Sequence, residues 1–596
     1  MKFLCLFIIT FITPTMTQVQ NPTIHYKLGI SEPSTHLFEV EISFENLPAS
    51  EKQFDLMMPA WRTGRYVIFD FAGGVQEFSA VGDGGKPLRW NKVDKQTWRI
   101  ETQGRTLTAR YKVYANEFNS RTRGLNDEHA FVDPASVFMY VEKFKSLPLE
   151  IEIIAPMGWH TTTGLDGVQG KTNRYTAPNY EYFADCPIEI GNQKDFEFDV
   201  EGKKHVLMIY GAGNWDEKKI IPDISKLVKA NKEFWGELPY ERYIFMLHVT
   251  PSSGGGTEHI NSTIMGTQPF VFKNPDRYLG FMGLVSHEYF HTWNVKQLRP
   301  SGIRPYDFSK ENYVKELWIA EGSTDYYGSL FLVRNGFMTP EKYLESVASG
   351  IQSERQRPGN RIQSATESSF DAWVKFWRET QNAYNSESDY YEKGAEVSLL
   401  LDLEIRQSSK NARSLDDVMK TMYQQFRLGK SGYTVDDFQK VAEQNAGKKL
   451  TSFFQDFAHG TKPLPWEQYL GYAGIEVAPK DTIPKAWLGL QTGGPAGSVR
   501  VNRVAAGSPA YEAGVDVGDE ILALNGFRLR GNDLQQRVSE MKAGDVVKLT
   551  VFRDDKLRDI EVVLRNQDIP SYRLAKTKNP SSLQKDIYEA WLKTKW

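Results

Sequence analysis

Apolar and polar residues alternate through much of the first third of the chain. From Phe38 to Phe44 every second residue is apolar and the others are charged or hydroxyl-bearing, and residues 107–113 repeat this period. A period of two places successive side chains on opposite faces of a β-strand. Turns rich in Gly, Pro and Asn separate such segments, so the pattern predicts an N-terminal antiparallel β-sandwich over residues 18–200. We expect this domain to contribute no chemistry of its own.

The pattern changes after residue 200. Apolar strands are expected at 206–210 and 243–250, with a helix at 215–235 between them. A glycine-rich loop at 252–259 follows the second strand, and apolar residues then recur at helical spacing. This order predicts a central α+β domain that becomes almost entirely helical, over residues 201–475.

Short strands return near the C-terminus. Residues 485–566 combine strand-like segments with turn glycines, among them Gly514 and Gly518. Residues 567–596 are predicted to be a tail with one amphipathic helix near 583–593. The fold prediction is therefore multidomain, with a C-terminal β domain.

The first 17 residues have the charged, apolar and small-residue order of a secretory signal peptide. The apolar stretch from Phe3 to Ile12 is far shorter than the roughly 20 residues that span a bilayer. We therefore predict cleavage near Thr17 and a secreted or periplasmic protein with no stable membrane span; a buried first helix or strand is the alternative. Cys5 lies in this segment, so Cys186 is left without a partner for an intramolecular disulfide.

Composition narrows the class of protein. The chain has 596 residues, with 72 Lys and Arg against 75 Asp and Glu, a net charge of −3. This balance argues against a polybasic nucleic-acid binder. With 40% hydrophobic and 13% aromatic residues, the chain can form several packed cores, and roughly 100 to 200 residues per domain predicts three or four domains.

The strongest chemical signal is the sequence His-Glu-Tyr-Phe-His at 287–291, flanked by apolar residues at helical spacing. On a helix, positions i and i+4 share one face, so His287 and His291 can offer two imidazole nitrogens to a single Zn²⁺. Glu288 lies beside them, where it can take a proton from the attacking water. The alternative is a pair of hydrogen-bonded core histidines.

A catalytic zinc ion needs a third protein ligand and an open position for water. Glu321 follows His291 at a spacing that lets a second helix pack back against the first, and Glu316 competes with it on spacing alone. Asp325 lies one turn beyond Glu321 and can accept a hydrogen bond from a ligand histidine. Solvated helix carboxylates are the alternative for these residues.

Two further segments can border a substrate. The glycine-rich loop contains Gly255 and Gly256, which allow close backbone approach, and ends in Glu258, whose carboxylate can hold a free α-ammonium group. Tyr391 opens a later apolar helix, where its phenol can donate to the oxyanion of a tetrahedral intermediate. A flexible turn and a packing tyrosine are the alternatives.

Together these motifs resemble metallopeptidase family sixty-one, the glycyl aminopeptidase-like enzymes of the gluzincin clan with a C-terminal PDZ domain. The resemblance extends over nearly the whole chain past the signal, including residues 58–72 and 293–300. It implies a central thermolysin-like zinc peptidase domain. His287, His291 and Glu321 would then be the zinc ligands.

The same resemblance implies that Glu288 is the general base. Glu258 matches the acidic residue of the family's Gly-Gly-x-Glu-His loop, and Tyr391 matches the tyrosine of its Tyr-Glu-Lys-Gly run. Two positions depart from the family pattern: Ser323 stands where an aromatic residue is usual, and Thr257 where an apolar residue is common.

Residues 487–564 resemble a PDZ domain. In that fold, backbone N–H groups next to a Gly-Leu pair, here Gly489 and Leu490, hold the C-terminal carboxylate of a peptide. The alternative is a domain that only packs over the catalytic cleft.

The combined prediction is a secreted zinc aminopeptidase that removes small first residues, Gly or Ala, from peptides with a free N-terminus. Nucleic acid is not expected as a partner. One alternative is an endopeptidase with the same zinc site. Another is a PDZ peptide-binding or chaperone protein with a vestigial metal site.

Overall fold

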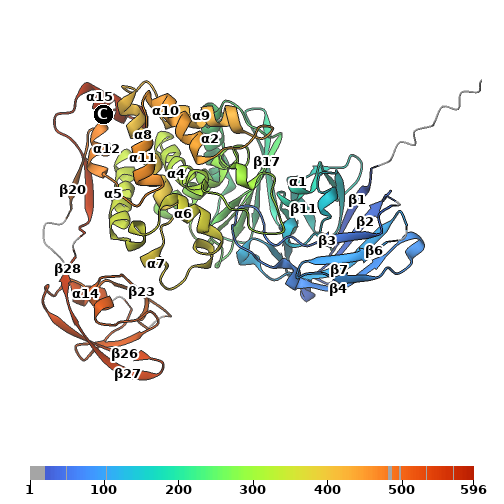
Figure 1. Ribbon diagram of the computed structural model, residues 1–596, viewed down its shortest axis with the longest axis horizontal. Helices are drawn as coiled ribbons and strands as arrows, with labels where there is room; N and C mark the ends of the chain where they lie inside the picture. Colours follow the sequence, from blue (N-terminus) through green and yellow to red (C-terminus); the bar gives the residue numbers. More distant parts are fainter. Residues whose placement is uncertain are drawn as a thin grey trace, which may run out of the picture.

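The computed structural model describes residues 21–48, 50–102, 104–480, 486–495, 498–531, 533–567 and 569–596. Along the chain, a β-rich part leads into a helical body, and a small β domain lies at the far end of the molecule (Figure 1). This order confirms the multidomain fold prediction. The predicted signal peptide, residues 1–17, lies outside the described residues. Within them, every helix is too short or too polar to cross a membrane.

The largest N-terminal sheet has seven strands in the order β12-β13-β10-β1-β2-β7-β4. They are β1 (Thr23–Gly29), β2 (Leu37–Glu45), β4 (Val75–Val81), β7 (Leu107–Tyr114), β10 (Leu149–Ile154), β12 (Asp166–Gly167) and β13 (Arg174–Ala177). The even-numbered apolar residues of β2 are buried, as the period of two predicts. However, β1 and β10 pair in parallel, so the expected all-antiparallel arrangement is wrong for this pair. Parallel neighbours need a long connection, and here it contains the strands between them.

Two smaller sheets complete the N-terminal domain. One has the order β11-β14-β9-β8 and the other β3-β6-β5. Their strands are β3 (Gln53–Met57), β5 (Trp90–Lys92), β6 (Thr97–Glu101), β8 (Arg123–Leu125), β9 (His129–Val132), β11 (His160–Thr163) and β14 (Ile188–Gly191), and the short helix α1 (Tyr180–Ala184) precedes β14. Phe131 of β9 packs in one apolar cluster with residues of the next sheet, so the two domains share a buried boundary.

The central sheet has the order β15-β16-β17-β19-β18. Its strands are β15 (Lys194–Val200), β16 (Lys203–Tyr210), β17 (Arg242–Val249), β18 (Gly256–Glu258) and β19 (Ser262–Thr267). Helix α2 (Glu217–Trp235) connects the parallel strands β16 and β17, which confirms the strand–helix–strand prediction. Among the described residues, β18 pairs with β19 alone and ends the sheet, so its other edge is available to an extended ligand.

Helices form the rest of the central domain. They are α3 (Pro275–Phe290), α4 (Ser323–Arg334), α5 (Pro340–Gln356), α6 (Ala365–Phe370), α7 (Ala383–Ser386), α8 (Glu392–Ser408), α9 (Leu415–Phe426), α10 (Val435–Ala446), α11 (Thr451–Phe453) and α12 (Trp466–Tyr472). Helix α3 begins where the Asn274 side chain accepts a hydrogen bond from the Arg277 N–H and Pro275 occupies the first turn. Gly328 of α4 lies so close to α3 that an added Cβ would be 3.3 Å from the Cα of His287. A larger residue at position 328 would therefore require α3 and α4 to move apart by a few tenths of an ångström.

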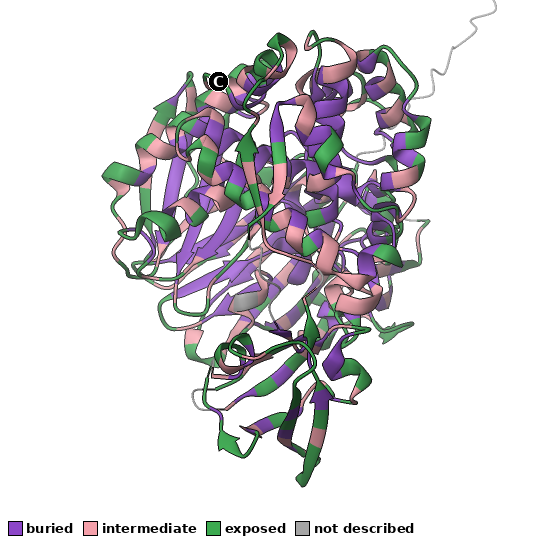
Figure 2. Ribbon diagram, turned by 90° about the vertical axis from the view of Figure 1, so that its left-hand side faces the viewer, coloured by how far each residue is buried: buried purple, intermediate pink, exposed green. Residues whose placement is uncertain are grey.

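The small C-terminal domain is inserted between two paired strands, β20 (Ile475–Pro479) and β29 (Tyr572–Lys576). It contains β21 (Ala486–Trp487), β22 (Leu490–Gly493), β23 (Arg500–Val504), β24 (Glu520–Leu524), β25 (Phe527–Arg528), β26 (Val546–Arg553), β27 (Lys556–Val563) and β28 (Arg565–Asn566), with α13 (Pro509–Glu512) and α14 (Asp533–Ser539). Its apolar residues form a core of their own, and Figure 2 shows them as buried positions on the lower strands.

The segment predicted as a tail returns to the helical body. Helix α15 (Ser582–Leu592) carries Trp591, which is fully buried and donates from its Nε1 to the hydroxyl of Tyr326 at 3.0 Å. Arg334 donates from its Nε to the carbonyl of Trp591 at 2.9 Å. The last residues therefore belong to the core of the central domain.

A buried polar cluster around Asp185 joins the N-terminal domain to the central one. Asp185 Oδ1 accepts from Thr63 Oγ1 at 2.8 Å and from Lys296 Nζ at 2.8 Å, and it lies 3.1 Å from His259 Nδ1. All four residues are buried. Burial by itself raises the pKa of Asp185, but Lys296 and His259 lower it to about 2, so the carboxylate is ionised.

We expect Asp185→Ala to lower the free energy of unfolding by about 3 to 5 kcal/mol, because it leaves Lys296 buried without a counter-charge. Chemical denaturation measures this loss. Because the folded pKa of Asp185 is about 2, below the unfolded value near 3.9, the stabilisation is complete above about pH 4 and decreases as the pH falls towards 2.

Arg110→Ala is the matched control, because it removes a partly exposed pair with Glu41 and should cost less than about 1 kcal/mol. If Asp185→Ala lowers the free energy of unfolding no more than this control does, the buried cluster does not stabilise the contact between the domains.

Candidate active site

Three donor atoms converge where α3 meets the π-helical turn η8 (Trp318–Gly322), a type of turn that often marks functional sites. The Nε2 atoms of His287 and His291 are 3.0 Å apart, and Glu321 Oε2 lies 3.1 Å from the second and 3.7 Å from the first. Donors bound to one metal ion at about 2.0–2.1 Å in a tetrahedron lie roughly 3.3 Å apart. The three atoms therefore have the separations that a metal ion requires.

The other ring nitrogen of each histidine has an acceptor. His287 Nδ1 lies 2.7 Å from Asp325 Oδ1, and His291 Nδ1 lies 2.6 Å from the carbonyl oxygen of Asn294. A histidine that donates from Nδ1 presents an unprotonated Nε2, which is the form that binds a metal. Asp325 thus lies where the sequence predicted an acceptor.

Asn294 is a structural contributor that the sequence analysis did not identify. Its Nδ2 donates to the carbonyls of Ile319 and Ala320 at 3.0 and 3.2 Å, and it lies 3.1 Å from Thr324 Oγ1. These bonds attach the end of α3 to the π-helical turn that carries Glu321. Its position shortly after the second histidine was the only available signal.

Glu316 lies outside the cluster of donors. Its Oε1 accepts from the backbone N–H of Val435 at 3.0 Å, and its Oε2 accepts from that of Lys315 at 2.8 Å. Among the described residues, the group around both histidines is completed by Glu321. Burial by itself raises the pKa of Glu321, but His291 and His287 lower it to about 2, so it offers an ionised carboxylate.

Glu288 lies against β18 at Gly256. A Cβ on Gly256 would lie 2.2 Å from Glu288 Oε1, so this close approach requires glycine at position 256. Oxygen atoms of Glu288 and Glu258 lie within 4.8 Å of each other and of a ring nitrogen of His291. Burial raises the pKa of Glu288 to about 7, opposed by His287 and His291, and its Oε2 has no hydrogen-bond partner among the described residues.

All eight predicted site residues line one cavity of about 470 Å³. They are Gly255, Gly256, Glu258, His287, Glu288, His291, Glu321 and Tyr391. The ring of Tyr391 lies nearly parallel to that of His287, with centroids 6.3 Å apart. Burial, together with Glu321, raises the pKa of Tyr391 well above its usual value, so its hydroxyl remains a donor.

The N-terminal domain, which was expected to contribute no chemistry of its own, forms part of the wall of this cavity. Gly64, Arg65 and Arg121 line the cavity together with Trp377 of the helical domain. Gly64 has a φ of +74°, and a Cβ there would lie 2.8 Å from Glu258 Oε2. The segment 58–72 contributed to the family resemblance, but nothing in the sequence singled out Arg121.

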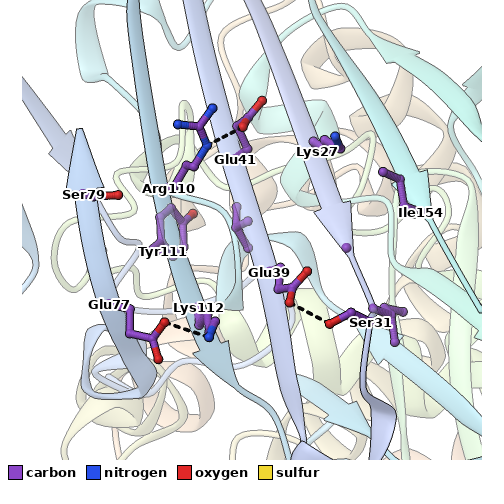
Figure 3. Close-up of a pocket in the computed structure, with 13 residues that line it drawn as sticks. Lys27, Ser31, Glu39, Glu41, Glu77, Ser79, Arg110, Tyr111, Lys112 and Ile154 are labelled. Atoms are coloured by element: carbon purple, nitrogen blue, oxygen red, sulfur yellow. Dashed lines mark hydrogen bonds and ion pairs between the residues drawn. The ribbon is translucent and has the colours of Figure 1, made fainter. Parts of the chain in front are cut away.

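A second hollow, of about 480 Å³, lies on the outer face of the seven-stranded sheet (Figure 3). Arg110 pairs with Glu41 at 2.6 Å and Lys112 with Glu77 at 2.7 Å. These charges neutralise one another. The hollow shares no lining residue with the cavity that contains His287, His291 and Glu321. The second hollow is therefore separate from the candidate active site.

Comparisons with known proteins agree with this description. Residues 25–192 match the model of the Peptidase M61 N-terminal domain, residues 280–397 that of the M61 glycyl aminopeptidase, and residues 471–564 that of a PDZ domain. No curated protein matched the chain.

Among solved structures, an aminopeptidase N family protein from Idiomarina loihiensis superposes with a TM-score of 0.90 at 28% identity, over 96% of this chain and 100% of that one. Yeast LTA4 hydrolase in complex with bestatin gives a TM-score of 0.45 at 14% identity, over 75% and 67% of the two chains. An M1 zinc metallopeptidase from Deinococcus radiodurans gives 0.44 at 12%, over 75% and 95%.

The fold and the family matches define a metallopeptidase of the aminopeptidase class with a C-terminal PDZ domain. Two models of the M61 peptidase family match the chain, which confirms the resemblance noted in its sequence. The prediction that it is a peptidase is likewise confirmed.

The donor geometry predicts different effects for the two competing glutamates. We expect Glu321→Ala to lower the affinity for Zn²⁺ by more than about 100-fold, since replacing even the hydrogen-bond partner of a metal ligand costs about 10- to 100-fold. Asp325→Asn should lower the affinity for Zn²⁺ by about 10- to 100-fold. Competition with a chelating dye measures both affinities.

Glu316→Ala is the control and should keep the affinity of the unmodified protein. A loss of metal with Glu316→Ala but not with Glu321→Ala would show that the wrong third donor has been identified.

Proposed function

We propose that the protein is a zinc aminopeptidase that removes small first residues, Gly or Ala, from peptides. The observation that carries the proposal is the triangle of His287, His291 and Glu321 donors beside the free edge of β18. Two imidazoles and one carboxylate with a position left open are the donor set of catalytic zinc sites. When bound there, Zn²⁺ would supply Lewis acidity towards the scissile carbonyl and a lowered pKa for water.

Glu288 is proposed as the general base. It is adjacent to His287 in sequence, lies against β18 at Gly256, and has a buried oxygen with no hydrogen-bond partner among the described residues. A carboxylate in this position can take a proton from the attacking water and return it to the leaving amine.

Tyr391 is proposed to donate a hydrogen bond to the developing oxyanion. Its ring lines the cavity beside His287, and burial keeps its hydroxyl protonated by raising its pKa. A fixed donor at the point where negative charge develops stabilises the transition state more than the substrate.

Glu258 is proposed to bind the free α-ammonium group of the substrate. Its side chain is only 4% exposed and forms no ion pair with any described residue. A substrate ammonium would form a charge-assisted hydrogen bond with it. Gly255 and Gly256 allow a substrate backbone to approach β18 closely, which favours small first residues.

Two further proposals concern the ends of the chain. The order of residues in segment 1–17 supports secretion or export to the periplasm. In the PDZ domain, Gly489 and Leu490 line a cavity of about 440 Å³ together with Arg355 and Arg361 of the helical domain. This setting suits the C-terminal carboxylate of a peptide.

We expect Glu288→Gln to retain zinc but to lower kcat by about 10²- to 10⁴-fold, because general-base catalysis contributes that much. Metal analysis and hydrolysis of an alanyl p-nitroanilide measure the two effects separately. Glu345→Gln on the exposed face of α5 is a matched control and should change neither. Full activity in Glu288→Gln would show that another group accepts the proton.

The role of Glu258 distinguishes an aminopeptidase from an endopeptidase. The unmodified protein should cleave free-amine peptides much faster than N-acetylated ones, and Glu258→Gln should reduce this preference by about ten- to a hundredfold, because the ammonium loses its charged partner. Paired peptides with and without the acetyl group measure the ratio. Rapid internal cleavage of an acetylated peptide would overturn the aminopeptidase proposal and leave the metal site standing.

A further inference from the structure

Two arginines in the wall of the active-site cavity lack a carboxylate partner. Arg65 and Arg121 both line the cavity, and neither forms an ion pair with a described residue. The Nε of Arg65 is buried and has no hydrogen-bond partner among those residues. In the hollow of Figure 3, by contrast, Arg110 and Lys112 are each paired with a glutamate. Both arginines are only half-buried, so their unpaired charges are open to the cavity and the pair is suited to an anionic ligand.

Arg121 is fixed along the edge strand. It follows the short turn η4 (Phe118–Ser120) in the left-handed region, with φ 50° and ψ 43°. Its Nε donates to Thr257 Oγ1 at 3.1 Å and its Nη1 donates to the carbonyl of Gly254 at 2.6 Å. Its Nη2 has no acceptor among the described residues, which leaves one donor group for a ligand.

Arg65 is held by aromatic rings rather than by acceptors. Its Cζ lies 4.8 Å from the centre of the Trp377 ring and 5.6 Å from that of Phe69. Stacking of this kind fixes the plane of the guanidinium but leaves its N–H groups unused. Burial lowers the pKa of Arg121. The charge of Glu288 opposes this shift and that of Arg65 adds to it, so the three charged groups are close enough to interact electrostatically.

The order of groups along β18 gives the direction of the substrate. Glu258 is at one end, Glu288 approaches at Gly256, and Arg121 reaches Gly254. An ammonium at Glu258 and a scissile bond near Gly256 place the leaving residue towards Gly254. Extended chains advance about 3.3 Å per residue, so a carboxylate one or two residues beyond the scissile bond is within reach of Arg121.

We propose that Arg65 and Arg121 bind a carboxylate on the leaving-group side, supplied by the C-terminus of a dipeptide or tripeptide. The preferred substrates are then short peptides with both ends free. This inference rests on the proposed aminopeptidase function, because it takes the scissile bond to lie beside Glu288. It adds a recognition site for the second end of the substrate.

The test compares alanyl-alanine, alanyl-alanine amide and alanyl-glutamic acid α-amide on the zinc-loaded full chain. We expect kcat/KM for the free acid to exceed that for the alanine amide by roughly ten- to a hundredfold, as expected for a hydrogen-bonded charge. The glutamic acid amide should behave like the alanine amide. Arg65→Gln and Arg121→Gln should each reduce the acid-to-amide ratio, and the exposed Arg277→Gln is the matched control that keeps it.

Zinc content and circular dichroism verify that each variant is folded. If Arg121→Gln does not fold, Arg121→Lys keeps the charge but loses the planar fork and should still reduce the ratio.

Equal rates for the free acid and the amide would overturn this inference while leaving the aminopeptidase proposal intact. Equal losses on both substrates in the arginine variants would also overturn it, because they indicate a role at the oxyanion. A high rate for alanyl-glutamic acid α-amide would show that the arginines bind a side-chain carboxylate. It would overturn the proposal that they bind the C-terminus of short peptides. Cleavage of no free-amine substrate would overturn the proposed function and this inference with it.

Discussion

The active-site cavity depends on the buried ion pair between Asp185 and Lys296. The partners of Asp185, which are Thr63, His259 and Lys296, come from three distant segments, and each lies within five residues of a residue that lines the cavity. Removing these groups from water is costly, and the cost is offset only when the hydrogen bonds are made together. The pairing therefore helps to hold the N-terminal domain where Arg65 and Arg121 line the same cavity as His287, His291 and Glu321.

A second constraint is the close approach of helices around the donors. Gly328 allows α4 to lie against α3, and an added Cβ on Gly322 would lie 2.4 Å from the Cα of Gly394. Such contacts bring Glu321 beside the two histidines and Tyr391 over the same cavity. The hydrogen bonds of Asn294 to Ile319 and Thr324 then fix the end of α3 relative to η8 and α4. Helix packing and these bonds together determine the positions of the donor atoms.

The PDZ domain is inserted between the paired strands β20 and β29. Asn385 of the helical domain donates to the carbonyl of Val504 at 2.9 Å and accepts from the N–H of Ala506 at 2.8 Å. Since the chain returns through α15 to the core, both ends of the inserted domain are held. Its cavity has no lining residue in common with the active-site cavity.

The sequence by itself determined the features that depend on local spacing. A period of two predicted β2 and β7 of the first sheet, and the i, i+4 spacing of His287 and His291 predicted that their side chains share one helix face, because both patterns follow from backbone geometry alone. Spacing alone did not distinguish Glu321 from Glu316, since both spacings are compatible with a return helix. The family resemblance favoured Glu321, and the tertiary structure places it beside the two histidines. The tertiary structure also revealed the parallel pairing of β1 with β10 and the position of Arg121, which contacts Gly254 at a separation of 133 residues. Local periodicity reports which face of an element is buried, but not which distant residue it meets there.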